Sequence, residues 1–124
     1  MRTEADQLKQ RTKEFSLRIL RLCDALPKTP SGRAIAGQLV RSGTSVGANY
    51  RAVCRARSHA EFIAKIGIVV EEADETVYWL DLLSHTGSIP KGRLDDLQRE
   101  ASELLAIFSA SQLTAKRNKQ FNRQ

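Results

Sequence analysis

Apolar residues recur at intervals of three and four positions along most of this chain, and this spacing constrains its fold more than any other feature. Between residues 41 and 83 it predicts two amphipathic helices that meet at Ser58, where Ser58 and Glu61 are expected to form a capping box. Similar apolar stripes precede Pro27 and follow Pro90. Four amphipathic helices with short connections predict an all-α fold, an antiparallel up-down-up-down four-helix bundle.

The ends of these helices follow from local signals. Pro27 ends the first helix, and Thr29 is placed to cap the second, with Pro30 at its first helical position. The expected helices span about residues 4–26, 30–57 and 58–84, with a fourth from beyond Pro90 to Leu113. The last residues, TAKRNKQFNRQ, are polar and basic without an acid, which predicts a mobile tail. We therefore expect a bundle domain at residues 1–115 and a basic flexible tail at residues 116–124.

The size and composition of the chain predict its domain number, its location in the cell and the state of its cysteines. A length of 124 residues suits one domain with a single core. No apolar run approaches the roughly 20 residues that a membrane helix needs, and the polar N-terminus has no signal-peptide core. We expect a cytoplasmic protein with no membrane partner. Cys23 and Cys54 both fall on apolar helix faces, so we expect two reduced thiols in the core.

Charge is distributed in blocks that change sign from helix to helix. Residues 30–57 carry five basic and no acidic side chains, whereas residues 58–86 carry one basic and six acidic ones. The arginines of the second helix project away from its apolar stripe, and the outer face of the third mixes acids with large apolar groups. Because these two surfaces differ, a contact between them in different copies is heterologous and must either close into a ring or grow into a fibre, and we expect a ring-like homo-oligomer. The expected oligomer interface comprises Arg41, Arg51, Arg55, Ile68, Glu72, Glu75, Trp79 and Leu83.

A second arrangement satisfies the same charges without an oligomer. Neighbouring helices of one bundle can pair Arg51 or Arg55 with Glu72 or Glu75. Small residues in the second helix, including Gly43, favour the close approach of another helix, and the alternative is a break in the helix at this position. The sequence leaves both alternatives open.

Catalytic and metal-binding patterns were sought and not found. His59 and His85 are 26 residues apart, or about 39 Å along a helix, so they cannot share one site within a chain. The acids around Glu72 are not accompanied by the Glu-x-x-His pairs of di-iron bundles, and the chain has no phosphate loop, dinucleotide fingerprint or zinc spacing. We therefore expect no enzyme activity, no metal and no cofactor.

Four segments resemble a known family. The run RSGTSVGANYR at residues 41–51 is followed by RARS at residues 55–58, by Phe62 and Ile63, and by EADETVYWL at residues 72–80. These segments resemble four-helix-bundle proteins encoded in intervening sequences of bacterial 23S ribosomal RNA genes. Such proteins are similar in fold to the accessory protein of diversity-generating retroelements. The resemblance implies a homopentameric ring with a basic surface that binds nucleic acid.

The charge pattern and the resemblance lead to one functional hypothesis. The formal net charge of +6 favours an anionic partner, and we expect a non-enzymatic homo-oligomer that binds RNA or DNA non-specifically through phosphates. The basic groups that the ring leaves free lie on the first helix and the tail. The expected nucleic-acid-binding residues are Lys9, Arg11, Lys13, Arg18, Arg21, Lys116, Arg117, Lys119 and Arg123. The alternative is a scaffold for an unknown protein partner, in which the basic charge serves only solubility.

Overall fold

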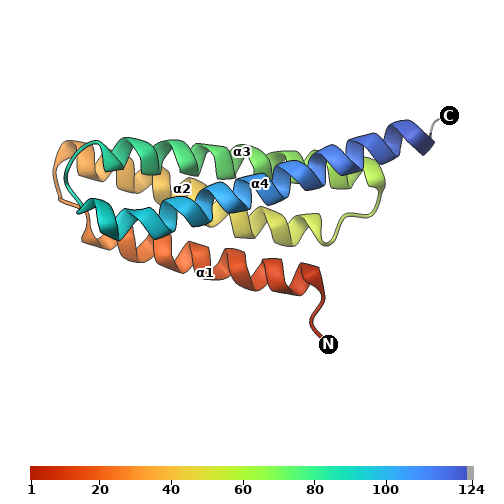
Figure 1. The fold of residues 1–124 in the computed structure, drawn as a ribbon, viewed down its shortest axis with the longest axis horizontal. Helices are drawn as coiled ribbons and strands as arrows, with labels where there is room; N and C mark the ends of the chain where they lie inside the picture. Colours follow the sequence, from red (N-terminus) through yellow and green to blue (C-terminus); the bar gives the residue numbers. More distant parts are fainter. Residues whose placement is uncertain (123–124) are drawn as a thin grey trace.

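The computed structural model describes residues 1–122, which form four helices and no strand (Figure 1). The helices are α1 (Glu4–Ala25), α2 (Pro30–Val53), α3 (His59–Ser84) and α4 (Lys91–Asn122). They lie side by side, with the α1–α2 and α3–α4 connections at one end of the molecule and the α2–α3 connection at the other (Figure 1). The predicted all-α four-helix bundle is confirmed. Within the described residues, no helix has an apolar stretch long enough to cross a membrane.

Three of the helices begin at a side-chain cap. The cap residues are Thr3, Thr29 and Ser58. The capping box predicted at Ser58 forms only in part. The Ser58 hydroxyl accepts a hydrogen bond from the Glu61 backbone N–H at 3.0 Å, but the Glu61 carboxylate accepts from the Arg57 N–H at 3.2 Å instead of that of Ser58. Local sequence thus fixes where these helices start.

One apolar core runs through the bundle. Its fully buried large side chains include Phe15, Ile19, Leu39, Ile66, Leu80, Leu94, Leu104 and Phe108. Cys23 is buried as expected, and burial raises the pKa of its thiol to about 11. Cys54 is exposed, so its assignment to the core was wrong. The reason is that α2 ends at Val53, and Cys54 lies in the turn that leaves the helix.

Leu83 does not belong to the outer face of α3. Its side chain is 1% exposed, in register with the buried Thr76 and Leu80 on the same stripe of the helix. The Thr76 hydroxyl is satisfied inside the core because it donates to the Glu72 carbonyl at 2.8 Å. The prediction that Leu83 faces a second copy is therefore wrong.

The last helix is longer than predicted. We expected it to end near Leu113, but α4 runs to Asn122, and the segment that we expected to be a tail forms its last turns. Between these points the sequence has no glycine or proline, and five of its residues are alanine, lysine, arginine or glutamine, which favour helix. Ala115 is buried, and its carbonyl accepts a hydrogen bond from Nε2 of His59 at 2.8 Å. Arg123 lies outside the described residues.

The small residues of α2 let α1 approach closely. The helix is unbroken at Gly43, which excludes the alternative of a break there. A Cβ added to Gly43 would lie 2.9 Å from side-chain carbons of Ile19, and one added to Gly47 would lie 3.3 Å from Thr12. Side chains larger than hydrogen at these two positions would push α1 away from α2.

Gly43→Ala should therefore destabilise the protein. Over-packing of this kind opposes folding by about 1–3 kcal/mol, which outweighs the gain in helix propensity of about 1 kcal/mol from alanine. Gly37→Ala is the matched control, because nothing lies within 4 Å of a Cβ added there. Chemical denaturation should show a lower free energy of unfolding for Gly43→Ala and an equal or higher one for Gly37→Ala. Equal effects of the two substitutions would contradict the close approach of the helices.

Candidate nucleic-acid interface

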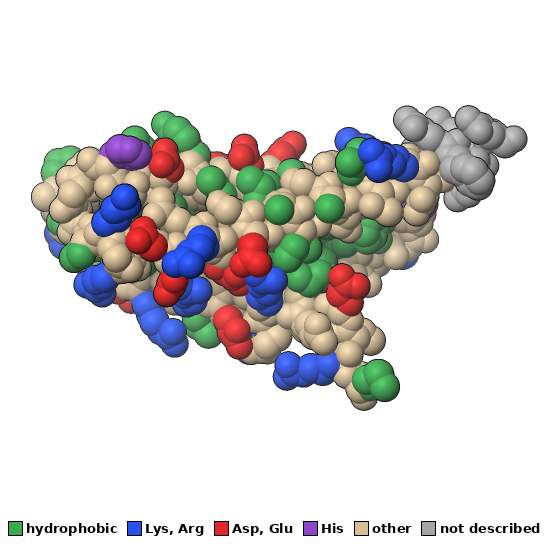
Figure 2. All heavy atoms as spheres, in the orientation of Figure 1, with side chains coloured by type: hydrophobic (Ala, Val, Ile, Leu, Met, Phe, Trp, Pro, Cys, Tyr) green, Lys and Arg blue, Asp and Glu red, His purple; other side chains and the backbone are tan. Residues whose placement is uncertain are grey.

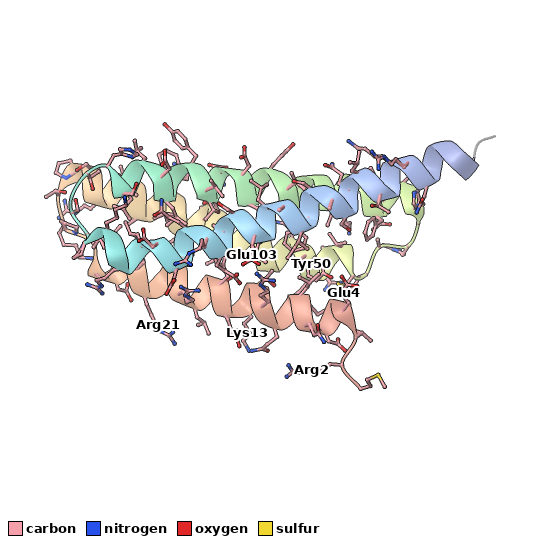
Figure 3. All side chains as sticks on the ribbon, in the orientation of Figure 1. Arg2, Glu4, Lys13, Arg21, Tyr50 and Glu103 are labelled. Carbon is pink, nitrogen blue, oxygen red and sulfur yellow. The ribbon has the colours of Figure 1, made fainter. Side chains whose placement is uncertain are left out.

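A groove lined in part by basic side chains lies along the contact between α1 and the second half of α2. It has a volume of about 320 Å³. We call it the lysine groove, and it is lined by Asp6, Lys9, Gln10, Thr12, Lys13, Ser16, Gly47, Ala48 and Arg51. Gly47 and Ala48 leave its floor bare, because neither has a side chain that could fill the space between the helices. Lys13 projects outward from α1 at this site (Figure 3).

The lysine groove has an excess of positive charge. Lys9, Lys13 and Arg51 form no ion pair within residues 1–122. Asp6 is the one carboxylate in the lining, and it accepts a hydrogen bond from the backbone N–H of Thr3, which lowers its pKa. Its charge is thus partly used at the start of α1. The groove is suited to an anion that is larger than one carboxylate.

A second basic site lies on the other edge of α1. It is a hollow of about 200 Å³ lined by Arg18, Arg21 and Leu22 from α1 and by Arg93 and Leu97 from α4. We call it the arginine hollow. The sequence analysis included Arg18 and Arg21 but missed Arg93, whose only local signal is a first turn of α4 without an acid. The structure therefore adds Arg93 to the candidate interface.

Arg11 has a structural role that was not predicted. Its Nε and Nη2 atoms donate to the two carboxylate oxygens of Glu100 at 2.8 and 2.7 Å, and Nη2 lies 3.2 Å from Glu103. These hydrogen bonds lower the pKa of the Glu100 carboxyl. Figure 2 shows basic and acidic side chains close together over α1 and α4. Arg11 thus links α1 to α4, and the carboxylates of Glu100 and Glu103 neutralise its charge. We therefore remove Arg11 from the candidate interface.

The basic end of α4 adds further charge. Lys116 and Arg117 are exposed on the last turns of α4, which project beyond the other helices (Figure 1). The side chain of Lys119 and the whole of Arg123 lie outside the described part of the chain. The structure thus places three of the four predicted tail residues, Lys116, Arg117 and Lys119, on α4.

Some of the residues predicted to form an oligomer interface already make contacts within the chain. Arg41 forms ion pairs with Glu72, at 3.2 Å, and with Glu75 of the same chain. Trp79 donates from its indole nitrogen to Glu75 at 3.3 Å. This pairing within one bundle is of the kind left open by the sequence, but it uses Arg41 where we had considered Arg51 or Arg55. Arg51, Arg55 and Ile68 are exposed, and Arg41 is exposed as well but is held in these ion pairs.

A larger hollow lies at the end of the bundle where α1 and α4 diverge. It has a volume of about 600 Å³, and Tyr50 and Phe108 line it, with ring centroids 5.1 Å apart. Glu4 lies close to Tyr50 at this end (Figure 3). Its lining is mainly apolar, and Glu4 and His59 are the acidic and basic side chains in it. These features do not suit a phosphate.

Metal ligands are not clustered in the structure. Within residues 1–122, no three histidine, cysteine, aspartate or glutamate side chains are close enough to hold a metal ion. His59 contacts α4, whereas His85 lies beyond the opposite end of α3 and bonds to the Asp81 carbonyl at 2.8 Å. The two imidazoles are as far apart as their spacing in the sequence predicted.

The family of the chain is now clear from comparison with known proteins. The model of the 23S rRNA-intervening sequence protein family matches residues 4–110. This chain belongs to that family. The resemblance found in the sequence is thus confirmed, and it covers α1, α2, α3 and most of α4.

A protein of solved structure has a similar fold. It is a protein of unknown function from the S23 ribosomal protein family of Bacteroides thetaiotaomicron, and it is 35% identical to this chain. The superposition has a TM-score of 0.78 and covers 84% of this chain and 96% of the solved one. No curated protein matches the chain. Family membership therefore supports the fold and leaves the function to be argued from the site.

The Arg11–Glu100 pair predicts how acid affects the stability of this protein. The pKa of the Glu100 carboxyl is lower in the folded state than in the unfolded state. The ionised carboxyl therefore stabilises the fold above the ordinary carboxylate pKa of about 4.3, and this stabilisation is lost as the pH falls through the pKa of the folded state. Glu100→Gln should lower the free energy of unfolding at pH 7 by about 1–2 kcal/mol and make it less dependent on pH in this acidic range. Urea denaturation from pH 3 to pH 7 measures both effects.

Asp96→Asn is the matched control for this experiment. Asp96 pairs with Arg99 on the exposed side of α4 at 2.9 Å. Exposed pairs contribute only about 0–1 kcal/mol. A control variant as unstable as Glu100→Gln would show that the contact between α1 and α4 has no special role.

Proposed function

We propose that the protein binds nucleic acid without sequence specificity, through phosphate contacts along α1. The observation that carries this proposal is the position of unpaired basic groups on both edges of one helix. Lys9 and Lys13 open onto the lysine groove with Arg51, and Arg18 and Arg21 open onto the arginine hollow. Groups placed in this way can contact a chain of phosphates that runs along or across α1.

The lining of the two sites favours phosphates over bases. Sequence-tolerant binding of bases uses aromatic side chains as stacking platforms. No aromatic residue lines the lysine groove or the arginine hollow. The groups available are lysine, arginine and small polar side chains, which bind phosphate oxygens and do not distinguish one base from another.

The length of the basic surface matches several phosphates. Lys9 and Arg21 are 12 positions apart on α1, which is about 18 Å along a helix. Lys116 and Arg117 at the end of α4 add a further basic site outside the bundle. Neutralising about five phosphates gives a slope of about −3.5 to −4.5 in a plot of log affinity against log salt. Binding should therefore be strong at low salt and weak at high salt.

Removing the charges of the lysine groove tests the proposal. A triple variant, Lys9→Gln, Lys13→Gln and Arg51→Gln, should bind RNA and DNA oligonucleotides more weakly. The slope against log salt should flatten by about 2.1 to 2.7, because three phosphate contacts are lost. Fluorescence anisotropy over a series of salt concentrations measures affinity and slope together.

A second triple variant controls for net charge. Arg33→Gln, Lys65→Gln and Arg99→Gln also removes three positive charges, from α2, α3 and α4. None of these residues lines the lysine groove. Equal losses of affinity in the two variants would show that net charge, and not the groove, governs binding. If the wild-type protein binds neither RNA nor DNA at about 50 mM salt, a protein-interaction scaffold replaces this proposal.

We also propose that the protein assembles into a ring-like homo-oligomer. Support comes from exposed apolar side chains on two different helices. Ile68, Tyr78 and Leu82 of α3 are 43%, 57% and 38% exposed, and Val40 of α2 is 37% exposed. Contact between two different surfaces is heterologous and must close into a ring to avoid a fibre. The number of five subunits comes from the family resemblance alone.

Light scattering tests the oligomer. A monomer has a mass of 13.9 kDa, and a pentamer should have five times that mass at micromolar concentration. Leu82→Gln should shift the protein toward the monomer, because it places a polar group in the proposed contact. Leu113→Gln, which changes a leucine on α4 that is 50% exposed, should leave the mass unchanged. A mass near that of one chain across a dilution series of the wild type excludes the ring.

A further inference from the structure

The arginine hollow differs in size and lining from the lysine groove. Its floor is formed by Leu22 and Leu97, and its sides carry Arg18, Arg21 and Arg93 from two helices. Its volume of about 200 Å³ is below the roughly 300–1,000 Å³ of pockets that enclose drug-sized ligands. The space is enough for one phosphate group with its water and too small for a nucleoside.

The arginines of the hollow have no partner of their own. Within residues 1–122, none of the three forms an ion pair. The charge of Arg18 contributes to the low pKa of Glu100, but both carboxylate oxygens of Glu100 already accept hydrogen bonds from Arg11. Three like charges around one small space favour the binding of an anion.

The chemistry of arginine indicates which kind of anion the hollow would bind. A guanidinium group presents a planar fork of N–H donors that pairs with two oxygens of one phosphate. A phosphate monoester carries a charge of about −1.5 to −2 at pH 7 and three free oxygens. An internal phosphodiester carries a single charge and two free oxygens. Three arginines therefore match a monoester better than an internal phosphate of a strand.

We propose that the arginine hollow binds the terminal phosphate of a nucleic-acid strand whose internal phosphates contact the lysine groove. This inference rests on the proposed function and adds recognition of a strand end to it. Lys13 and Arg21 project from the same outer side of α1 (Figure 3), so a strand that crosses this side passes from the groove to the hollow. The phosphate would bind through the three guanidinium groups, because the other lining residues, Leu22 and Leu97, have no side-chain hydrogen-bond donor.

Matched oligonucleotides test the inference. Three internally labelled single strands of one sequence carry a 5′-phosphate, a 3′-phosphate or hydroxyl groups at both ends, and anisotropy gives their affinities for the full chain. At least one phosphorylated strand should bind roughly tenfold more tightly than the hydroxyl strand. Arg93→Gln should abolish this difference, so that the phosphorylated and hydroxyl strands bind the variant with equal affinity. Arg93→Lys should lose most of the difference too, because it keeps the charge and removes the fork.

Arg99→Gln is the control for this experiment. It changes an exposed arginine of the same helix that does not line the hollow, so the preference for a phosphorylated strand should persist. Circular dichroism of each variant confirms that the bundle is intact.

The possible failures of the two proposals differ. If all three strands bind equally and the lysine-groove variant weakens them equally, the proposed function stands and the recognition of strand ends is wrong. If inorganic phosphate binds the wild type and not Arg93→Gln in calorimetry, while strand ends have no effect, the hollow is a small-anion site and the inference is overturned. If no strand binds at about 50 mM salt, both proposals fail.

Discussion

The close approach of α1 and α2 is the constraint on which the rest of the structure depends. Gly43 and Gly47 let α1 lie against α2 with Ile19 and Thr12 in contact with their backbone. Gly47 also lines the lysine groove, beside Ala48, whose side chain is only a methyl group. One run of small residues therefore sets the distance between two helices and lines the groove in which their basic groups meet.

The lack of acids in α2 decides which of its charges stay free. No aspartate or glutamate occurs between residues 25 and 60, so an arginine of α2 can be neutralised only by another helix. Arg41 faces α3 and pairs with Glu72 and Glu75. Arg51 faces α1, where lysines lie across the groove, and it stays without an ion pair among the described residues. The direction of each side chain around the helix thus separates a structural arginine from a candidate binding one.

The fold was predictable from the sequence because periodicity and caps are local signals. The apolar spacing gave four helices, and Thr29 and Ser58 cap them where expected. Errors occurred near helix ends, at Cys54 and Leu83, where a small shift in the end of a helix or in its phase moves a side chain between core and surface. The candidate site was less predictable. The partner of Arg11 lies 89 positions away, and the hollows exist only where two helices meet.

Binding of a polyanion would be coupled to the stability of the bundle. α1 contacts α2 much more extensively than α4, and its attachment to α4 includes the pairing of Arg11 with Glu100 and Glu103. The remaining basic groups of α1 repel one another and Arg51 or Arg93 across the two sites. A bound strand removes this repulsion in the folded state and holds both edges of α1 to its neighbours. Since a ligand that prefers the native state stabilises it by mass action, nucleic acid should stabilise this helix at low salt and lose the effect as salt screens the charges.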